Sequence, residues 1–379
     1  MKRMMSPLLL ALLLASLALL PQTALAGQFK KPVYYAAPGL PEVVVKADFN
    51  HDKNLDLAVA DFGNQVVQTL LGRGDGSFRK GPSFPIAGPY SPVGLAVGDF
   101  DHDGTPDLTV VEYNGPGVGK LGIFLGNGDG TFHQSAEYQL AVMPLSAAVA
   151  DFDGDGHPDV AVTNEGTNGN GSVMVFFGNG DGTFRGPTTY KLSFYPYSVA
   201  AGDLNGDGHP DLAVAEYNAG VAVLLNKGNG KFGKAVINPV NPAAVTNVVI
   251  ADLNHDHRPD LVVATFHAVG VLLGKGGGKF QKTVLYSTTA ISTGNPSAVV
   301  VADFNRDGNP DIATVLEAGD SGLFYGKGDG TFGPVVPIKL KLRSTGGTSL
   351  VAADFNKDHA PDLAIVQNIG DIAVLLNSQ

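Results

Sequence analysis

Short apolar runs recur along the whole chain and alternate with polar segments that are rich in glycine. Runs such as residues 95–97, 212–214 and 221–225 consist mainly of small and β-branched side chains. Near-continuous apolar stretches of this length are typical of β-strands that are covered on both faces. Fifty glycines and 24 prolines stand in short clusters between the runs, as expected for many tight turns. The pattern predicts an all-β chain.

The apolar runs fall into repeating units of four predicted strands. In the clearest unit, residues 146–150 lead into an acidic loop at residues 151–159, and strands follow at 160–163 and 172–177. A glycine-rich turn and a segment that contains Tyr190 complete the unit. The acidic loops share the pattern Asp-[Phe/Leu]-[Asn/Asp]-x-Asp-x-x-x-Asp and begin 49–52 residues apart. They lie at residues 48–56, 99–107, 151–159, 203–211, 252–260, 303–311 and 354–362.

Seven units of about 50 residues, each forming a four-stranded sheet, predict a β-propeller. A linear β-solenoid remains as an alternative, although its repeats are usually shorter. The last unit stops at Asn377, where the others continue into Gly-x-Phe, and Gly27, Gln28 and Phe29 supply this motif near the N-terminus. We therefore expect residues 27–379 to form a seven-bladed propeller whose N-terminal strand completes the last blade. Such closure removes an open seam between strand edges.

The acidic loops have the composition of a metal site. Positions 1, 3, 5 and 9 carry side-chain oxygens and position 7 offers its carbonyl, an arrangement similar to the calcium loop of EF-hands. Hard oxygen donors favour calcium over transition metals, and magnesium requires a tighter octahedron. The residues predicted to hold up to seven calcium ions are Asp48, Asn50, Asp52, Asn54, Asp56, Asp99, Asp101, Asp103, Thr105, Asp107, Asp151, Asp153, Asp155, His157, Asp159, Asp203, Asn205, Asp207, His209, Asp211, Asp252, Asn254, Asp256, Arg258, Asp260, Asp303, Asn305, Asp307, Asn309, Asp311, Asp354, Asn356, Asp358, Ala360 and Asp362.

Position 6 of the loop needs a sharp turn and is glycine in four of the seven copies. The other loops carry Lys53, His257 and His359 there, and we expect weaker binding in them because a side chain opposes a left-handed backbone. Without residues 1–26 the chain has 23 basic and 36 acidic residues, a net charge of −13. Clustered carboxylates repel one another without a counter-ion, so we expect the fold to depend on calcium.

Residues 1–26 have the features of a secretory signal peptide. Lys2 and Arg3 precede an apolar run at residues 8–20, and residues 24–26 form a small-x-small cleavage site. An uncleaved anchor is the alternative, but a spanning helix needs about 20 apolar residues. No later segment is apolar enough to span a membrane, and the chain has no cysteine for a disulfide. We expect a secreted protein, extracellular or periplasmic, that is a monomer.

The consensus Asp-Phe-Asn-x-Asp-Gly-x-Pro-Asp-Leu, followed by Leu-Gly-Asn-Gly-Asp-Gly-Thr-Phe, resembles the FG-GAP/VCBS repeat family. Its best-known members are the propellers of integrin α-subunits. The resemblance implies that the calcium loops join the first and second strands on the lower face, while ligands engage the upper face. Integrins bear such loops on only some blades, so an integrin role is not expected, and fungal lectins with integrin-like propellers are more similar in architecture. Residues 73–75 spell the Arg-Gly-Asp adhesion motif, which we interpret as a coincidence of a repeated turn.

Aromatic residues beside amides and carboxylates mark the predicted upper face. Such groups commonly hold sugars, by stacking and by polar contacts at the edges. The candidate ligand-binding residues are Glu112, Tyr113, Asn114, Glu216, Tyr217, Asn218, Tyr90, Tyr195 and Tyr197. The alternative interpretation is that these aromatics pack loops against neighbouring blades.

The predicted function is a non-catalytic adhesion or recognition module for glycan or protein ligands. A carbohydrate-active enzyme, a glycosidase or lyase with Glu112 and Glu216 as acid and base, is the alternative. The two acids lie two units apart and no Ser-His-Asp or histidine-rich metal constellation is evident, which favours binding over catalysis. The acidic charge and the lack of a basic patch argue against nucleic acid as a partner.

Overall fold

The computed structural model describes residues 28–37, 39–115, 117–167, 169–338, 340, 347–368 and 370–379. The regular elements of these residues are all β-strands. The described part of the chain contains no helix long and apolar enough to cross a membrane. The predicted signal peptide, residues 1–26, lies outside the described residues.

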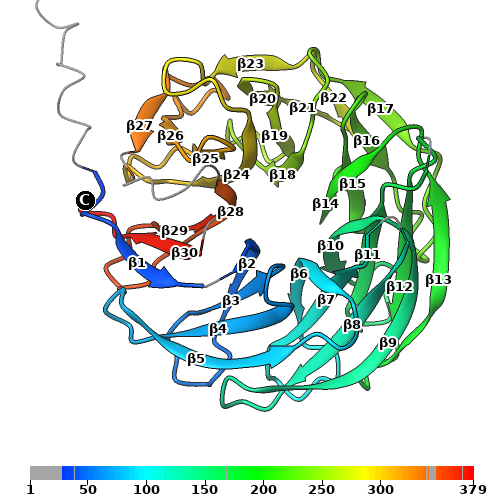
Figure 1. The fold of residues 1–379 in the computed structure, drawn as a ribbon. Helices are drawn as coiled ribbons and strands as arrows, with labels where there is room; N and C mark the ends of the chain where they lie inside the picture. The colour runs from blue at the N-terminus through cyan, green and yellow to red at the C-terminus, as the bar shows by residue number, and fades with distance from the viewer. Residues whose placement is uncertain are drawn as a thin grey trace, which may run out of the picture.

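Seven four-stranded antiparallel sheets stand around a central axis as the blades of a propeller (Figure 1). The first, innermost strands are β2 (Pro41–Ala47), β6 (Ser91–Gly98), β10 (Pro144–Ala150), β14 (Pro196–Gly202), β18 (Asn247–Ala251), β24 (Pro296–Ala302) and β28 (Gly347–Ala353). The second strands are β3 (Asp56–Asp61), β7 (Asp107–Tyr113), β11 (Asp159–Asn164), β15 (Asp211–Glu216), β19 (Asp260–Thr265), β25 (Asp311–Leu316) and β29 (Asp362–Gln367).

The outer half of each blade contains the third and fourth strands. The third strands are β4 (Val66–Gly72), β8 (Val118–Gly126), β12 (Ser172–Gly178), β16 (Gly220–Leu224), β20 (Ala268–Leu272), β26 (Ser321–Phe324) and β30 (Asp371–Leu375). The fourth strands are β5 (Phe78–Pro85), β9 (Phe132–Val142), β13 (Phe184–Lys191), β17 (Val236–Pro239), β23 (Val284–Ser287), β27 (Val336–Ile338) and β1 (Val33–Ala36). A small hairpin of β21 (Gly274–Gly276) and β22 (Lys279–Phe280) stands between β20 and β23.

The hydrophobic core lies between the blades rather than within one central mass. Each of seven apolar clusters combines side chains of two adjacent sheets. The second strands are buried along almost their whole length because a neighbouring blade covers each face, which explains their continuous apolar sequence. The fourth strands form the solvent-exposed rim, as in β13.

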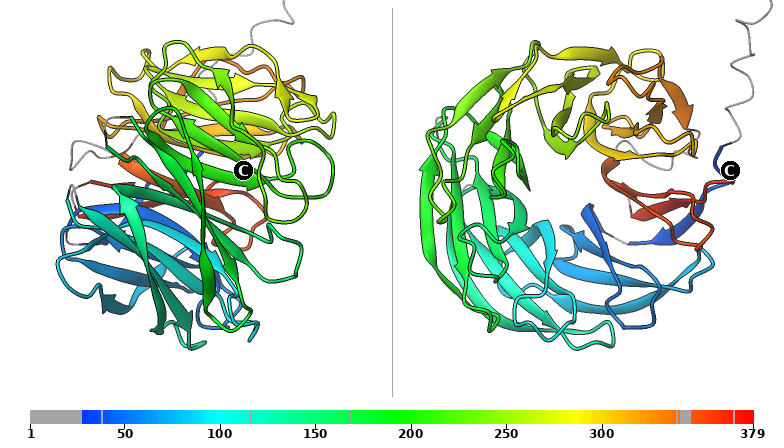
Figure 2. Two further views of the ribbon diagram at one scale, coloured as in Figure 1. Left: turned by 90° about the vertical axis from the view of Figure 1, so that its right-hand side faces the viewer. Right: turned by 180° about the vertical axis from the view of Figure 1, so that it is seen from behind.

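The N-terminal strand closes the ring, as predicted. β1 pairs with β30 in the last blade, and Val33 lies opposite Val374. An apolar cluster that contains Val44 and Leu57 of the first blade together with Val366 of the seventh spans the junction. The view from behind in Figure 2 shows the blue segment at the start of the described residues beside the red C-terminal segment. The fold class is therefore confirmed, including the closure.

The antiparallel order of the strands defines two faces. The lower face carries the loops between first and second strands and the turns between third and fourth strands. The upper face carries the loops between second and third strands and the connections from one blade to the next. All seven acidic loops consequently lie on the lower face.

Candidate functional site

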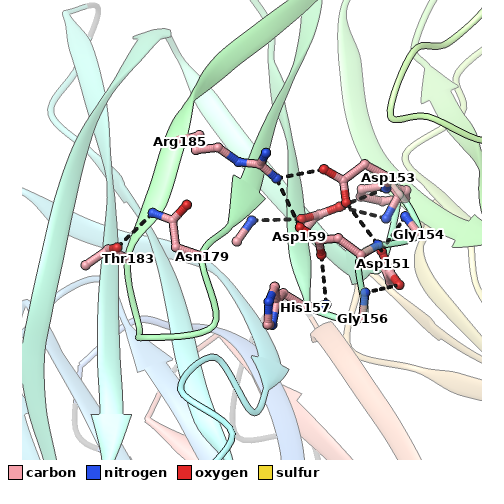
Figure 3. A network of polar contacts seen from close by, with 12 residues as sticks. Asp151, Asp153, Gly154, Gly156, His157, Asp159, Asn179, Thr183 and Arg185 are labelled. Carbon is pink, nitrogen blue, oxygen red and sulfur yellow. Dashed lines mark hydrogen bonds and ion pairs between the residues drawn. The ribbon is translucent and has the colours of Figure 1, made fainter.

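The acidic loops are shaped by hydrogen bonds between aspartate side chains and the loop backbone. In the third loop, Oδ1 of Asp151 accepts from the backbone N–H of Gly154 at 2.7 Å, and Oδ2 accepts from that of Gly156 at 2.9 Å (Figure 3). Oδ1 of Asp155 accepts from the N–H of His157 at 2.9 Å. The Asp155 bond is an Asx turn, and the two Asp151 bonds reach further along the loop, which explains why aspartate recurs at positions 1 and 5.

Two positions of every loop have a left-handed backbone. Position 6 does so as predicted, and Lys53, His257 and His359 adopt φ values of 66°, 61° and 65° there. Position 4 does so as well, which the sequence did not reveal because five of the seven loops carry a side chain at that position. Those residues are His51, His102, His255, Arg306 and Lys357. A left-handed backbone at each of these side chains costs about 1–2 kcal/mol relative to a right-handed one. The expected weaker calcium binding in the first, fifth and seventh loops stays a prediction.

The aspartate at position 9 links the start of the second strand to the acidic loop and to the end of the third strand. Asp107 is fully buried at the start of β7, and its Oδ2 accepts from the N–H of Phe100 at 2.7 Å. Its Oδ1 accepts from the N–H of Gly126, at the end of β8, at 2.8 Å. Burial raises the pKa of Asp107 to about 6, although the two backbone hydrogen bonds oppose this shift. The same pair of bonds occurs in all seven loops, so this residue has a structural task besides any metal binding.

The second and third loops bring three carboxylates together. Ligand oxygens of Asp99, Asp101 and Asp107 lie within 4.8 Å of one another, and so do those of Asp151, Asp153 and Asp159 in the next loop. Oδ1 of Asp99 is buried without a hydrogen-bond partner, which leaves its charge unsatisfied. An all-oxygen donor set with such an orphaned atom fits a hard divalent cation.

The set of oxygen donors differs between loops, and in the third loop an arginine lies against it. Five loops have asparagine at position 3, whose amide donates to the aspartate at position 5, as Asn305 does to Asp307 at 3.0 Å. In the third loop, Nη2 of Arg185 lies 2.7 Å from Asp153 and 3.3 Å from Asp155 (Figure 3). This guanidinium offsets part of the loop's negative charge. No sequence pattern indicated this contact, because Arg185 lies outside the repeat motif.

Backbone hydrogen bonds tie the first four acidic loops and the seventh to the next blade. The N–H of Gly130, in the turn between β8 and β9, donates to the carbonyl oxygen of Phe49 in the first loop at 2.9 Å. The Arg-Gly-Asp tripeptide occupies the same kind of turn. The N–H of Arg73 donates to the carbonyl of Ser77 at 2.9 Å, and Asp75 accepts from the N–H of Ser77 at 2.9 Å. The interpretation that residues 73–75 fill a repeated turn slot is confirmed.

The candidate residues on the upper face separate into two groups. In the second blade, Nζ of Lys120 lies 4.5 Å from the ring centroid of Tyr90 and 2.7 Å from Glu137. The neighbouring Glu112 is only 2% exposed, and burial followed by the charge of Glu137 raises its pKa to about 7. Tyr113 is half-buried against this region and Asn114 is exposed.

The second group lies in the fourth blade. The rings of Tyr197 and Tyr217 stack at 5.3 Å with an interplanar angle of 29°, and the N–H of Tyr217 donates to the carbonyl of Tyr195 at 2.9 Å. Asn218 is exposed beside them. Glu216 is fully buried, and burial raises its pKa to about 7.

Glu112 and Glu216 therefore do not lie where a ligand-binding residue is expected. Both end a second strand, and both are buried within the packed blades. Neither carboxyl lines the hollows found on the upper face. A pKa near 7 suits a general acid, but a buried carboxyl is out of direct reach of a ligand in this conformation.

Three adjoining hollows lie at the upper mouth of the central channel, with volumes of about 260, 310 and 230 Å³. Glu42 lines all three. Tyr197 lines two of them, and Tyr113 lines the third together with Phe62. Glu42 was not among the predicted ligand-binding residues, although a single acid at the start of the apolar run 43–45 was a usable signal.

The fold and the acidic loops define a class of protein: a β-propeller built from repeats with an oxygen-lined loop in each blade. The FG-GAP-like repeat family matches residues 48–110, 107–162, 151–214, 203–263, 252–314 and 315–365. The chain therefore belongs to the FG-GAP-like repeat family, which confirms the resemblance of its motifs.

Curated relatives include an integrin alpha chain and a phospholipase D. Integrin alpha-PS2 of Drosophila melanogaster is 28% identical over 214 residues, which are 46% of this chain and 15% of that protein. Phosphatidylinositol-glycan-specific phospholipase D of Bos taurus is 29% identical over 167 residues, 35% of this chain and 19% of that protein. The chain thus spans less than a fifth of the length of either relative, and the ligand must be argued from the site.

Solved structures share the fold over most of the chain. BBS1N in complex with ARL6DN has a TM-score of 0.63 at 13% identity and covers 93% of this chain and 97% of that one. A lectin of Agrocybe aegerita has a TM-score of 0.57 at 21% identity, with 88% of this chain and 87% of that one covered.

Proposed function

We propose that the protein is a secreted, calcium-binding propeller that recognises a glycan or protein ligand with its upper face. The observation that carries the proposal is the stacked pair Tyr197 and Tyr217 beside the channel mouth, where Tyr217 is 38% exposed. An exposed aromatic face next to polar groups gives a ligand both stacking area and hydrogen bonds. Calcium in the lower loops would hold the blades in register without taking part in recognition.

The structural neighbours support both kinds of ligand. The lectin of Agrocybe aegerita is described as recognising non-reducing terminal N-acetylglucosamine, and BBS1N was solved in complex with another protein. Low sequence identity limits these neighbours to an analogy of fold, so they suggest ligand classes rather than a particular ligand.

A glycan array with the calcium-loaded protein, free of residues 1–26, tests the proposal. A lectin is expected to bind a coherent set of sugars, and Tyr217→Ala is expected to reduce this binding about tenfold or more. Val236→Ala is the matched control, because Val236 is 61% exposed on the outer strand β17 and should leave binding unchanged. Two negative results together would contradict the proposal. The folded protein would bind no sugar on the array, and a pull-down would capture no partner protein whose binding depends on Tyr217.

The enzyme alternative makes a separate prediction. Turnover of a glycoside that is lost in Glu112→Gln or Glu216→Gln, with calcium binding retained, would establish it. The burial of both carboxyls favours the binding proposal, since catalysis would require one of these side chains to leave the protein interior.

A further inference from the structure

Each of the seven blades places one residue, within its innermost strand or just before it, at the channel mouth, six positions before the first aspartate of its loop. These residues are Glu42, Val93, Leu145, Tyr197, Thr246, Ser297 and Thr348, and all seven line the central hollow. Glu42 is the charged member of this ring. The structural repeat makes it stand out, because the equivalent positions in the other blades carry neutral side chains.

The Glu42 carboxylate has no hydrogen bond or ion pair with any residue in the described ranges, and burial raises its pKa above the ordinary value. Glu317 is the other charged residue among those lining the three hollows, and it is also an acid. The mouth therefore presents negative charge without a cation from the described part of the chain. A partly desolvated carboxylate without a partner is costly, and an incoming cation would remove that cost.

Three hydroxyl groups of this ring offer acceptors rather than donors. Those of Thr246, Ser297 and Thr348 donate their protons to main-chain carbonyl oxygens at 3.2, 3.1 and 3.3 Å, respectively. With each proton engaged, the oxygen lone pairs are what remains for a ligand. The two carboxylates and these three hydroxyls together favour a group that donates several hydrogen bonds and accepts none, which is the property of ammonium and guanidinium ions.

Apolar and aromatic surfaces flank Glu42. Phe62, Tyr113, Met143 and Leu145 line the hollow on one side of it, and Tyr197 lines the hollows on the other. The first surface suits a hydrocarbon stem, and the face of Tyr197 suits a cation through its ring quadrupole.

We propose that the upper mouth of the channel binds an organic cation, an ammonium or guanidinium group on an apolar stem, with Glu42 as its ion-pair partner. This inference rests on the proposed function, because it assigns a ligand chemistry to the same face. A free amine and the lysine or arginine side chain of a partner protein share this chemistry. The hollows of 230–310 Å³ accommodate such a side chain.

Isothermal titration of the calcium-loaded protein with three probes tests the inference. The probes are N-acetyl-lysine methylamide, its Nε-acetylated analogue, which lacks the charge, and a ten-residue peptide with one central lysine. We expect saturable binding of the charged lysine probes and at least tenfold weaker binding of the acetylated probe. Tighter binding of the peptide than of the single amino acid would identify a protein side chain as the source, and equal binding would identify a free amine.

Glu42→Gln keeps the shape of the side chain and removes its charge, so it is expected to weaken binding of the charged probes at least tenfold. Asp320→Asn is the matched control, because Asp320 lies on an upper-face loop but does not line the hollows. Unchanged thermal unfolding of both variants would show that the fold is intact. Equal binding by wild type and Glu42→Gln, or no saturable binding of either charged probe, would overturn the inference. Tyr217-dependent glycan or protein binding would in that case leave the proposed function standing.

Discussion

The backbone N–H of Gly76 in the first blade donates a 3.1 Å hydrogen bond to the carbonyl oxygen of Phe355 in the seventh. Phe355 is the second residue of the last acidic loop, so this bond ties a candidate metal loop to the junction where the ring closes. Gly130 and Phe49 make the equivalent bond between the second and first blades. The conformation of the first four loops and of the seventh is thereby coupled to the packing of the next blade.

Removal of calcium is therefore expected to destabilise the whole ring rather than single loops. A site that binds the folded state alone adds about 2.7 kcal/mol at a ligand concentration 100 times its dissociation constant. We expect thermal unfolding in excess chelator to occur several degrees below that in millimolar calcium, in one cooperative transition. Magnesium at the same concentration is the control for ionic strength and should restore less stability. An unfolding temperature that chelator does not change would contradict calcium dependence.

Asp107→Ala is expected to destabilise the protein with or without calcium. The substitution leaves the buried N–H groups of Phe100 and Gly126 unpaired, at about 1–3 kcal/mol each. Asp129→Ala is the control, because Asp129 is an exposed turn residue in the same blade and its loss should cost about 1 kcal/mol or less. Urea unfolding in calcium and in chelator measures both variants. A loss of stability confined to the calcium-loaded protein would show that Asp107 acts as a metal ligand alone.

The sequence predicted the fold almost completely because each blade repeats the same local signals. The acidic loop, the buried second strand and the Gly-x-Phe motif at residues 27–29 each defined a place in the ring. The candidate ligand site was predicted less well. The repeat pattern places Glu112 and Glu216 at the upper end of their strands, but side-chain direction between blades is set by packing, which buries both. Glu42 was missed because its position in the lining of all three hollows depends on seven strands converging, which no local pattern reveals.

Deletion of residues 28–38 is expected to lower the unfolding temperature and promote aggregation. The deletion removes β1 and leaves β30 as an unpaired edge, an arrangement that invites pairing with other chains. A milder test is Gln28→Ala, since the buried Gln28 side chain contacts the carbonyl of Phe304 and the hydroxyl of Tyr325.

Lys30→Ala is the control for the Gln28 variant, because Lys30 is exposed on the same segment. Thermal unfolding and light scattering measure stability and association. Wild-type behaviour of both the deletion and Gln28→Ala would mean that the N-terminal strand is dispensable for ring closure.

Glu216→Gln is expected to stabilise the protein at alkaline pH. Neither Glu216 oxygen has a hydrogen-bond partner of normal geometry, and burial raises its pKa from 4.5 to about 7 in the folded state, with a small opposing effect of the Ser193 backbone. Because the folded state binds this proton more tightly than the unfolded state, the contribution of Glu216 is fully present below pH 4.5 and is lost as the pH rises through 7. Glutamine stays neutral throughout, so the free energy of unfolding of the variant should exceed that of wild type by up to roughly 3 kcal/mol at pH 8 and match it at pH 4.5.

Urea unfolding at both pH values measures this difference, with the exposed Glu317→Gln as control. The same pH dependence in wild type and Glu216→Gln would mean that Glu216 is solvated or paired when the protein folds in solution.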